Sequence, residues 1–228
     1  MKKIFWKIPE KLIPNLEFVY TKPSVDGGSL PTLYLLHGQF DTEDDWWSEK
    51  GQLEEILLGI NATPMLIVMP FCSKEKLTNP RDQNEPSLSD FKARFDGIVQ
   101  KVEGHFKPDH TKKAILGISM GGKQALAVVL NAKRKYSALG VLSGKLQGNN
   151  YGELKEFVKI WPQNLKQELN LYFHYCGTEE VAFYENNKKV CNELGGEIRT
   201  QKEGTHGWDF WRPELTEFIR KLAQIWSS

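Results

Sequence analysis

The chain has 228 residues, of which 40% are hydrophobic and 26% charged, as is usual for a globular domain. Because 30 basic side chains face 29 acidic ones, the net charge of +1 gives no reason to expect nucleic acid or an anionic membrane as a partner. No segment approaches the roughly 20 apolar residues of a membrane span, and Lys7 and Pro9 interrupt the start of the chain where a signal peptide would be apolar. We therefore expect a soluble cytoplasmic protein with a single domain over residues 1–228.

The cysteines, Cys72, Cys176 and Cys191, are odd in number and lie in or beside apolar segments. This placement predicts reduced core thiols rather than a disulfide framework. No cysteine and histidine cluster has the spacing of a zinc site, so we expect neither a metal nor an organic cofactor.

Apolar runs divide most of the chain into strands. Two short extended segments come first, around residues 4–8 and 15–21. The later runs do not alternate with polar residues, which is typical of parallel strands buried on both faces. They cover residues 32–36, 64–69, 113–118, 138–142 and 169–175, and a last strand is expected at about 197–202.

Helical spacing appears between these runs. Apolar residues recur at three- and four-residue intervals over 88–106, where Ser87 and Asp90 offer a capping box. A later helix ends at 195–196, a pair of glycines, and the last helix carries Pro213 in its first turn. Strands that alternate with helices predict an α/β fold, a three-layer sandwich with a mostly parallel central sheet.

The most polar and irregular stretch covers residues 73–86, directly after a predicted strand. Open α/β sheets place their ligand crevices at the carboxyl ends of strands. The stretch is therefore either part of a substrate-binding rim or a solvated surface loop, and the sequence leaves both readings open.

The strongest local motif is Gly-Ile-Ser-Met-Gly-Gly at 117–122, between a strand and an apolar helix. This is the context of a nucleophile elbow, a turn so tight that only small residues fit around the serine. The turn would lift the hydroxyl of Ser119 above the sheet and bring it to a helix N-terminus, where the N–H of Met120 can bind an oxyanion.

A serine hydroxyl needs a neighbouring base, and five histidines compete for that role. His105 and His110 precede the nucleophile, and His174 lies in an apolar strand, as a core histidine would. His37 belongs to a loop after the first buried strand. His206 follows the last predicted strand and precedes the final helix, so it is the expected base.

The orienting acid should follow the strand after the nucleophile and precede the histidine. Glu179 and Glu180 occupy that place, and either one could hold the imidazole in its productive tautomer. Acidic residues also settle in the first turn of a helix because of its dipole. The two readings can each apply to one glutamate.

The loop His37-Gly38-Gln39 is expected to supply the second half of an oxyanion hole. The glycine lets the backbone turn after the strand, and the N–H of Gln39 would then point into the crevice. His37 would be structural and fix this loop by hydrogen bonds.

Together these motifs resemble the esterase family of α/β-hydrolases that includes esterase D-like enzymes, tributyrin and feruloyl esterases, and mycolyltransferases. The resemblance covers about residues 32–226. It rests on Leu-Leu-His-Gly at 35–38, the elbow at 117–122, Leu-Ser-Gly at 142–144, Cys-Gly-Thr-Glu-Glu at 176–180 and His-Gly-Trp-Asp-Phe-Trp at 206–211.

The resemblance implies an α/β-hydrolase fold and assigns roles by position. The acid falls on Glu180, where members usually carry aspartate, so this chain is longer there by one methylene. The N–H groups of Gln39 and Met120 are implied as the oxyanion hole. Trp208 and Trp211 are read mainly as packing around the base, with pocket lining as the lesser alternative.

The function that follows is a serine carboxylesterase that acts on small or short-chain acyl esters through an acyl-enzyme, without a cofactor. Trp46 and Trp47 either form an aromatic substrate wall or pack the core. The alternatives are an esterase or thioesterase for a specialised substrate (siderophore, hydroxycinnamoyl or S-formylglutathione type) and a non-catalytic binding protein of the same fold. A homodimer is compatible with the resemblance, although no residue argues for one.

Overall fold

The computed structural model describes residues 6–8, 19–21, 29–60, 62–73, 85–132, 136–147, 151–160, 169–200 and 205–227. Within these residues, eight strands form one sheet in the order β1-β2-β4-β3-β5-β6-β7-β8. From β4 to β8 all neighbours are parallel, whereas β1 and β2 add an antiparallel edge. The strands are β1 (Trp6–Ile8), β2 (Val19–Thr21), β3 (Thr32–Leu36), β4 (Leu66–Val68), β5 (Lys113–Ile118), β6 (Ala138–Leu142), β7 (Leu171–Tyr175) and β8 (Ile198–Arg199).

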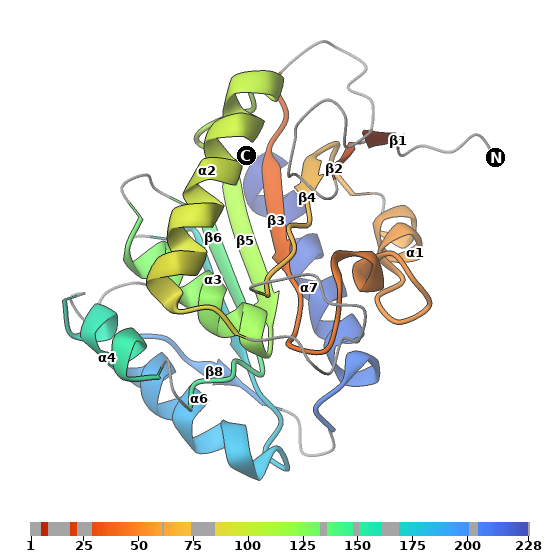
Figure 1. Ribbon diagram of the computed structural model, residues 1–228. Helices are drawn as coiled ribbons and strands as arrows, with labels where there is room; N and C mark the ends of the chain where they lie inside the picture. The colour runs from red at the N-terminus through yellow and green to blue at the C-terminus, as the bar shows by residue number, and fades with distance from the viewer. Residues whose placement is uncertain are drawn as a thin grey trace.

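Helices cover both faces of this sheet, which confirms the predicted three-layer α/β sandwich (Figure 1). On one face lie α2 (Leu88–Phe106), α3 (Met120–Leu130), α4 (Tyr151–Ile160) and α6 (Val181–Glu193), and on the other lie α1 (Leu53–Gly59) and α7 (Trp208–Ser227). A short 3-10 helix, η2 (Glu43–Trp46), follows β3. The strand order reverses between β3 and β5, so their carboxyl ends form the topological switch point at which such sheets bind ligands.

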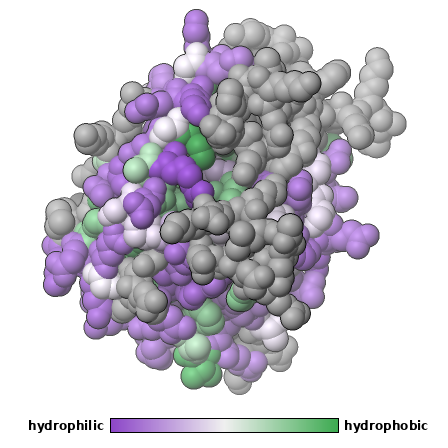
Figure 2. Space-filling view, viewed as in Figure 1, coloured by the Kyte–Doolittle hydropathy of each residue, from purple (hydrophilic) through white to green (hydrophobic). Residues whose placement is uncertain are grey.

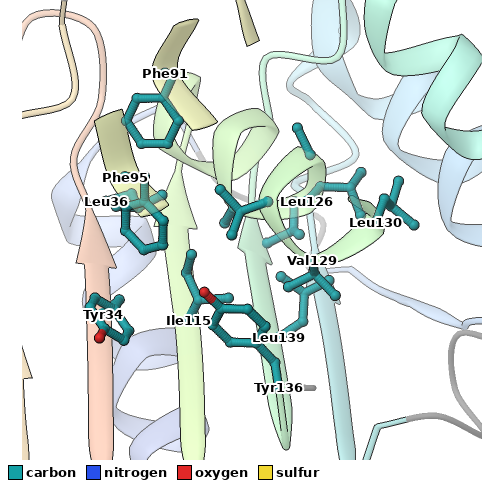
Figure 3. Packing of buried hydrophobic residues seen from close by; sticks show 14 of the residues in the cluster. Tyr34, Leu36, Phe91, Phe95, Ile115, Leu126, Val129, Leu130, Tyr136 and Leu139 are labelled. Atoms are coloured by element: carbon teal, nitrogen blue, oxygen red, sulfur yellow. The ribbon is translucent and has the colours of Figure 1, made fainter. Parts of the chain in front are cut away.

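The core divides into two apolar clusters because successive strand residues point to opposite faces. In β3, Tyr34 and Leu36 join the cluster beneath α2 and α3, whereas Leu33 and Leu35 join the one beneath α1 and α7. Figure 3 shows the first cluster, in which the ring of Phe95 packs edge-on against Tyr34 at 5.2 Å between centroids. Both faces are therefore buried, which is why these strands read as continuous apolar runs.

Several predicted boundaries needed correction. The strands expected at 64–69, 169–175 and 197–202 are shorter at one or both ends, although residues 201–204 lie outside the described part of the chain. The last helix begins at Trp208, so Pro213 lies in its second turn rather than its first. The Gly207 carbonyl accepts the N–H groups of Phe210 and Trp211, so the first turn of the helix is complete before Pro213. Of the expected capping box, the structure gives the bond from Asp90 N–H to Ser87 Oγ, at 3.0 Å.

The surface drawn in Figure 2 is mostly hydrophilic over the described residues, with small separate apolar areas. Phe40, Leu58 and Val181 are the large apolar side chains that stand exposed in the described part of the chain. Across that same part, no helix is long and apolar enough to cross a membrane.

Candidate active site

Ser119 occupies the turn between β5 and α3 with a backbone φ of 51° and ψ of −115°, a conformation that a non-glycine residue rarely adopts. The turn closes so tightly that a Cβ at Gly117 would lie 2.1 Å from the Gly121 carbonyl oxygen. A Cβ at Gly121 would lie equally close to the carbonyl oxygen of Leu36, in the neighbouring strand. The small residues around the serine are therefore required by the backbone itself, as the motif predicts.

The structure brings Ser119, His206 and Glu180 together from three separate segments of the chain. His206 Nε2 lies 2.9 Å from Ser119 Oγ, and its Nδ1 lies 2.6 Å from Glu180 Oε2. Because a carboxylate oxygen accepts hydrogen bonds, Nδ1 carries the imidazole N–H and donates a hydrogen bond to Glu180. Nε2 is then free to accept the serine hydroxyl, as a general base must. Glu179 is exposed on the surface and has no part in this chain of contacts.

Glu180 is held by two further hydrogen bonds in a buried position. Its Oε1 accepts from the Ser143 hydroxyl at 2.6 Å and from the backbone N–H of Gly177 at 3.0 Å. Ser143 in turn accepts the indole N–H of Trp211 at 3.1 Å. With both bonds on Oε1, the second oxygen faces His206. The sequence motif Leu-Ser-Gly contains Ser143 but predicts no role for it, because only the fold brings it to Glu180.

Two aromatic side chains fix the imidazole of His206. The ring of Phe183 stacks on it at 4.2 Å between centroids and an interplanar angle of 11°, and Trp211 meets it edge-on at 4.9 Å. Trp211 therefore packs around the base, in agreement with its predicted role. The sequence gives no signal for this role of Phe183, since an aromatic residue in a helix looks the same whether it contacts a catalytic residue or the core.

In the loop after β3, His37 has the structural role that the sequence predicts for it. His37 Nδ1 donates to the Gly38 carbonyl at 2.7 Å, and its Nε2 accepts the N–H of Cys72 at 2.9 Å, so His37 ties this loop to the segment after β4. Burial lowers the pKa of His37 to about 4 and keeps the ring neutral. Gln39 and Met120 flank Ser119, the first from this loop and the second as the first residue of α3.

An open cavity of about 480 Å³ adjoins the serine. Its walls are largely apolar and aromatic, with two charged residues, Asp41 and Lys145. Burial raises the pKa of Asp41, which accepts a bond from the indole N–H of Trp208 at 3.1 Å. The lining residues are Gly38, Gln39, Phe40, Asp41, Ser119, Lys145, Phe183, His206, Gly207, Trp208 and Trp211.

The tryptophans predicted as substrate contacts divide between the cavity and the core. Trp208 lines the cavity. Trp46 does not, because it is fully buried and packs edge-on against Trp208 at 5.0 Å between ring centroids. Trp47 packs against the same apolar cluster, partly exposed, outside the cavity lining. Core packing, the second reading of Trp46 and Trp47, is the one that agrees with their positions.

The remaining histidines lie away from the serine. His174 is a core histidine, as predicted, bonded to Tyr172 Oη and Asn187 Oδ1 at 2.8 Å each. His110 faces Glu103 near the opposite end of β5, and His105 packs on Phe106. The three cysteines are buried thiols that form no disulfide, as expected. No group of three His, Cys, Asp or Glu side chains within the described ranges could hold a metal ion.

Comparison with known proteins identifies the family of the chain. A family model described as "Putative esterase" matches residues 15–222, which is most of the chain.

Solved structures of esterases share the architecture. The chain is similar to a ferulic acid esterase, with a TM-score of 0.69, 18% identity and coverage of 91% of each chain. An S-formylglutathione hydrolase from Agrobacterium tumefaciens gives a TM-score of 0.66 at 15% identity, with 96% of this chain and 94% of that one covered. An enterobactin esterase from Shigella flexneri gives 0.68 at 16% identity, over 99% of this chain and 60% of that one. At these identities the likeness establishes the fold, an α/β-hydrolase fold.

Proposed function

Since the chain belongs to the "Putative esterase" family and is a serine ester hydrolase, we propose that it cleaves small or short-chain acyl esters through a covalent intermediate on Ser119. The observation that carries this proposal is the continuous hydrogen-bonded chain from Ser119 through His206 to Glu180, at 2.9 and 2.6 Å, at the edge of an open cavity. We also propose that residues 1–228 form a single domain.

Acylation begins when His206 Nε2 takes the proton of Ser119 Oγ as that oxygen attacks the ester carbonyl. Negative charge develops on the carbonyl oxygen, and the N–H groups of Gln39 and Met120 stabilise it. The first N–H groups of a helix have no partner within the helix, so Met120 at the start of α3 suits this task. Protonated His206 then gives its proton to the leaving alcohol.

Deacylation repeats these steps with water as the nucleophile. His206 deprotonates the water, the same two N–H groups stabilise the second tetrahedral oxyanion, and Ser119 leaves as the free hydroxyl. In both halves, Glu180 stabilises the imidazolium through Nδ1–H, and its bonds to Ser143 and Gly177 keep its carboxylate oriented.

The cavity supports a substrate of modest size. Its volume of about 480 Å³ lies within the range of small-molecule sites. Phe40 and Trp208 belong to its walls, so an ester with a flat or apolar group is favoured over a purely polar one.

Hydrolysis of p-nitrophenyl esters from acetate to octanoate tests this function, with wild type and Ser119→Ala compared side by side. We expect turnover of the shorter chains by the wild type and a loss of roughly 10⁴-fold or more in kcat/KM in the variant. A fluorophosphonate probe should label the wild type at Ser119 and leave the variant unlabelled. Esterase activity retained by Ser119→Ala would overturn the assignment.

The assignment of the acid has a matched pair of variants in adjacent glutamates. Glu180→Gln should lower kcat by about 10³-fold, because an amide cannot hold the imidazole in the productive tautomer. Glu179→Gln removes the same charge from an exposed neighbour and should leave kcat within about twofold. The reverse result would move the acid to Glu179.

A further inference from the structure

Lys145 is a charged residue of the cavity wall that the proposed mechanism does not use. It follows β6, and its backbone N–H donates to the carbonyl of Ser119 at 2.8 Å. Its ammonium donates to Gln39 Oε1 at 2.6 Å, in the loop after β3. Because β5 lies between β3 and β6 in the sheet, the Lys145 side chain crosses the end of the strand that carries the nucleophile.

The ammonium of Lys145 is only partly neutralised. Its acidic neighbour is Glu85, whose Oε2 lies at the long distance of 3.4 Å, while Glu85 Oε1 lies 2.5 Å from the buried ammonium of Lys123. One carboxylate thus serves two ammonium groups. The negative charge of Glu153 also acts on Lys123. The oxygens of Glu153, however, already accept hydrogen bonds from the N–H groups at the start of α2. Among the described residues, the close partner of Lys145 is therefore the neutral amide oxygen of Gln39.

The other charged residue of the wall, Asp41, is more fully engaged. Its Oδ1 accepts from Trp208 Nε1–H at 3.1 Å and from the Lys50 ammonium at 3.2 Å. Lys50 also pairs with Asp45 at 3.0 Å, so this side of the cavity keeps a negative balance. The two sides thus differ in sign, positive at Lys145 and negative at Asp41, and a charged substrate has a preferred orientation between them.

We propose that Lys145 makes this cavity select esters that carry a second, anionic group, a carboxylate or a comparable oxyanion. This inference rests on the proposed esterase function and narrows its substrate class. The anionic group replaces the amide oxygen of Gln39 as the partner of the ammonium, because a full negative charge attracts the ammonium more strongly than the partial charge of an amide oxygen does. With 28% of its side chain exposed, Lys145 is accessible to such a group without a change in the fold.

Two ester pairs test the proposal, each an anionic ester beside a neutral one of similar size. Mono-p-nitrophenyl glutarate and p-nitrophenyl pentanoate differ by a carboxylate on the acyl side. 4-Acetoxybenzoate and 4-methylphenyl acetate differ by a carboxylate on the alcohol side. For each protein, kcat/KM of the anionic ester is divided by kcat/KM of its neutral partner, and the ratio in each variant is compared with that of the wild type. The intrinsic reactivity of the two esters and any loss of activity common to both then cancel.

In Lys145→Met we expect this ratio to fall by about tenfold for one pair, and the pair that responds identifies the side of the substrate that carries the charge. Lys145→Arg should keep most of the preference. Asp41→Asn should raise the ratio about twofold, because it removes the negative charge from the opposite wall. Lys159→Met changes the net charge equally on the exposed face of α4 and should leave both ratios unchanged.

A ratio that is the same in wild type and Lys145→Met for both pairs would overturn the proposal. An equal fall of the anionic-to-neutral ratio in Lys145→Met and in Lys159→Met would also overturn the proposal, since the effect would then come from the net charge of the protein. The neutral esters keep the two proposals apart. If they are hydrolysed by wild type and not by Ser119→Ala, the esterase function stands whatever the ratios show; if no ester is hydrolysed and Ser119 is not labelled, both proposals fail together.

Discussion

At the scale of single residues, the side chain that contacts His206 Nδ1 is a glutamate, Glu180, which is longer than aspartate by one methylene. The added methylene gives the side chain one more rotatable bond, so the carboxylate must be held in place or it would rotate away from the base. Two donors to one oxygen, Ser143 Oγ–H and Gly177 N–H, hold it and leave the other oxygen for His206. Ser143 itself has a φ of 46°, so the backbone after β6 accepts a strained conformation to present this hydroxyl.

Ser143→Ala should therefore lower kcat by about 10- to 100-fold with KM changed less than threefold, because it frees the carboxylate of Glu180 and leaves the buried indole N–H of Trp211 without its acceptor. Steady-state kinetics of p-nitrophenyl acetate hydrolysis measures both constants.

The matched control for this prediction is Ser137→Ala. Ser137 lies just before β6, is buried, and also accepts an indole N–H, that of Trp226, at 3.3 Å. Its loss should lower the free energy of unfolding by about 1–2 kcal/mol, as at Ser143, while kcat stays within about twofold. A similar fall in kcat in both variants would mean that Ser143 acts through stability alone.

At the scale of elements, the unit β5–turn–α3 decides where the nucleophile lies. Ser119 keeps its strained φ because the strand, the helix and the neighbouring β3 backbone meet around it, with distances that leave no room for a Cβ at Gly117 or Gly121. The motif signals this unit in the sequence because the steric requirement is local. The start of α7, by contrast, depends on a turn at Gly207 that carries no such signal.

Gly117→Ala should abolish esterase activity and lower the free energy of unfolding by more than about 3 kcal/mol, since its Cβ would meet the Gly121 carbonyl at 2.1 Å. Gly104→Ala is the matched control. Gly104 lies in α2 with open space around a Cβ, so there the same change should stabilise the protein by about 0.5–1 kcal/mol. Urea unfolding of the three proteins distinguishes the cases, and a tolerated Gly117→Ala would contradict the steric argument.

At the scale of the whole molecule, the two apolar clusters lie on opposite faces of one sheet and share its strands. The last helix returns to the far end of the sheet, where the Trp226 carbonyl accepts the ammonium of Lys112. We propose that the chain unfolds as one cooperative unit for this reason. Urea transitions followed by far-ultraviolet circular dichroism and by tryptophan fluorescence should coincide, and two separate transitions would refute a single domain.

Stability should also decrease as the solution becomes acidic. Burial lowers the pKa of His37 and of His174 from 6.5 to about 4, so between these values the unfolded chain binds protons that the folded chain does not. The free energy of unfolding therefore falls as pH drops from 6.5 to about 4, by up to roughly 3 kcal/mol for each histidine. Below pH 4 this contribution no longer changes. Urea midpoints at pH 7 and pH 4.5 measure the slope.

In His174→Gln, the loss of unfolding free energy between pH 7 and pH 4.5 should be about half of that in the wild type. Each protein is compared with its own stability at pH 7. A slope that is unaltered in His174→Gln would show that the buried histidines do not carry the effect.

The sequence by itself determined the fold class, the nucleophile elbow, most strands and the order of the catalytic candidates, because these depend on local sterics and on periodic burial. It left Glu179 and Glu180 as alternatives and two readings for Trp46 and Trp47. Only the tertiary structure decided which side chains meet, since contacts such as Ser143 with Glu180, Phe183 with His206 and Lys145 with Gln39 join segments far apart in the chain. Their geometry follows from strand order and packing, which no short stretch of sequence encodes.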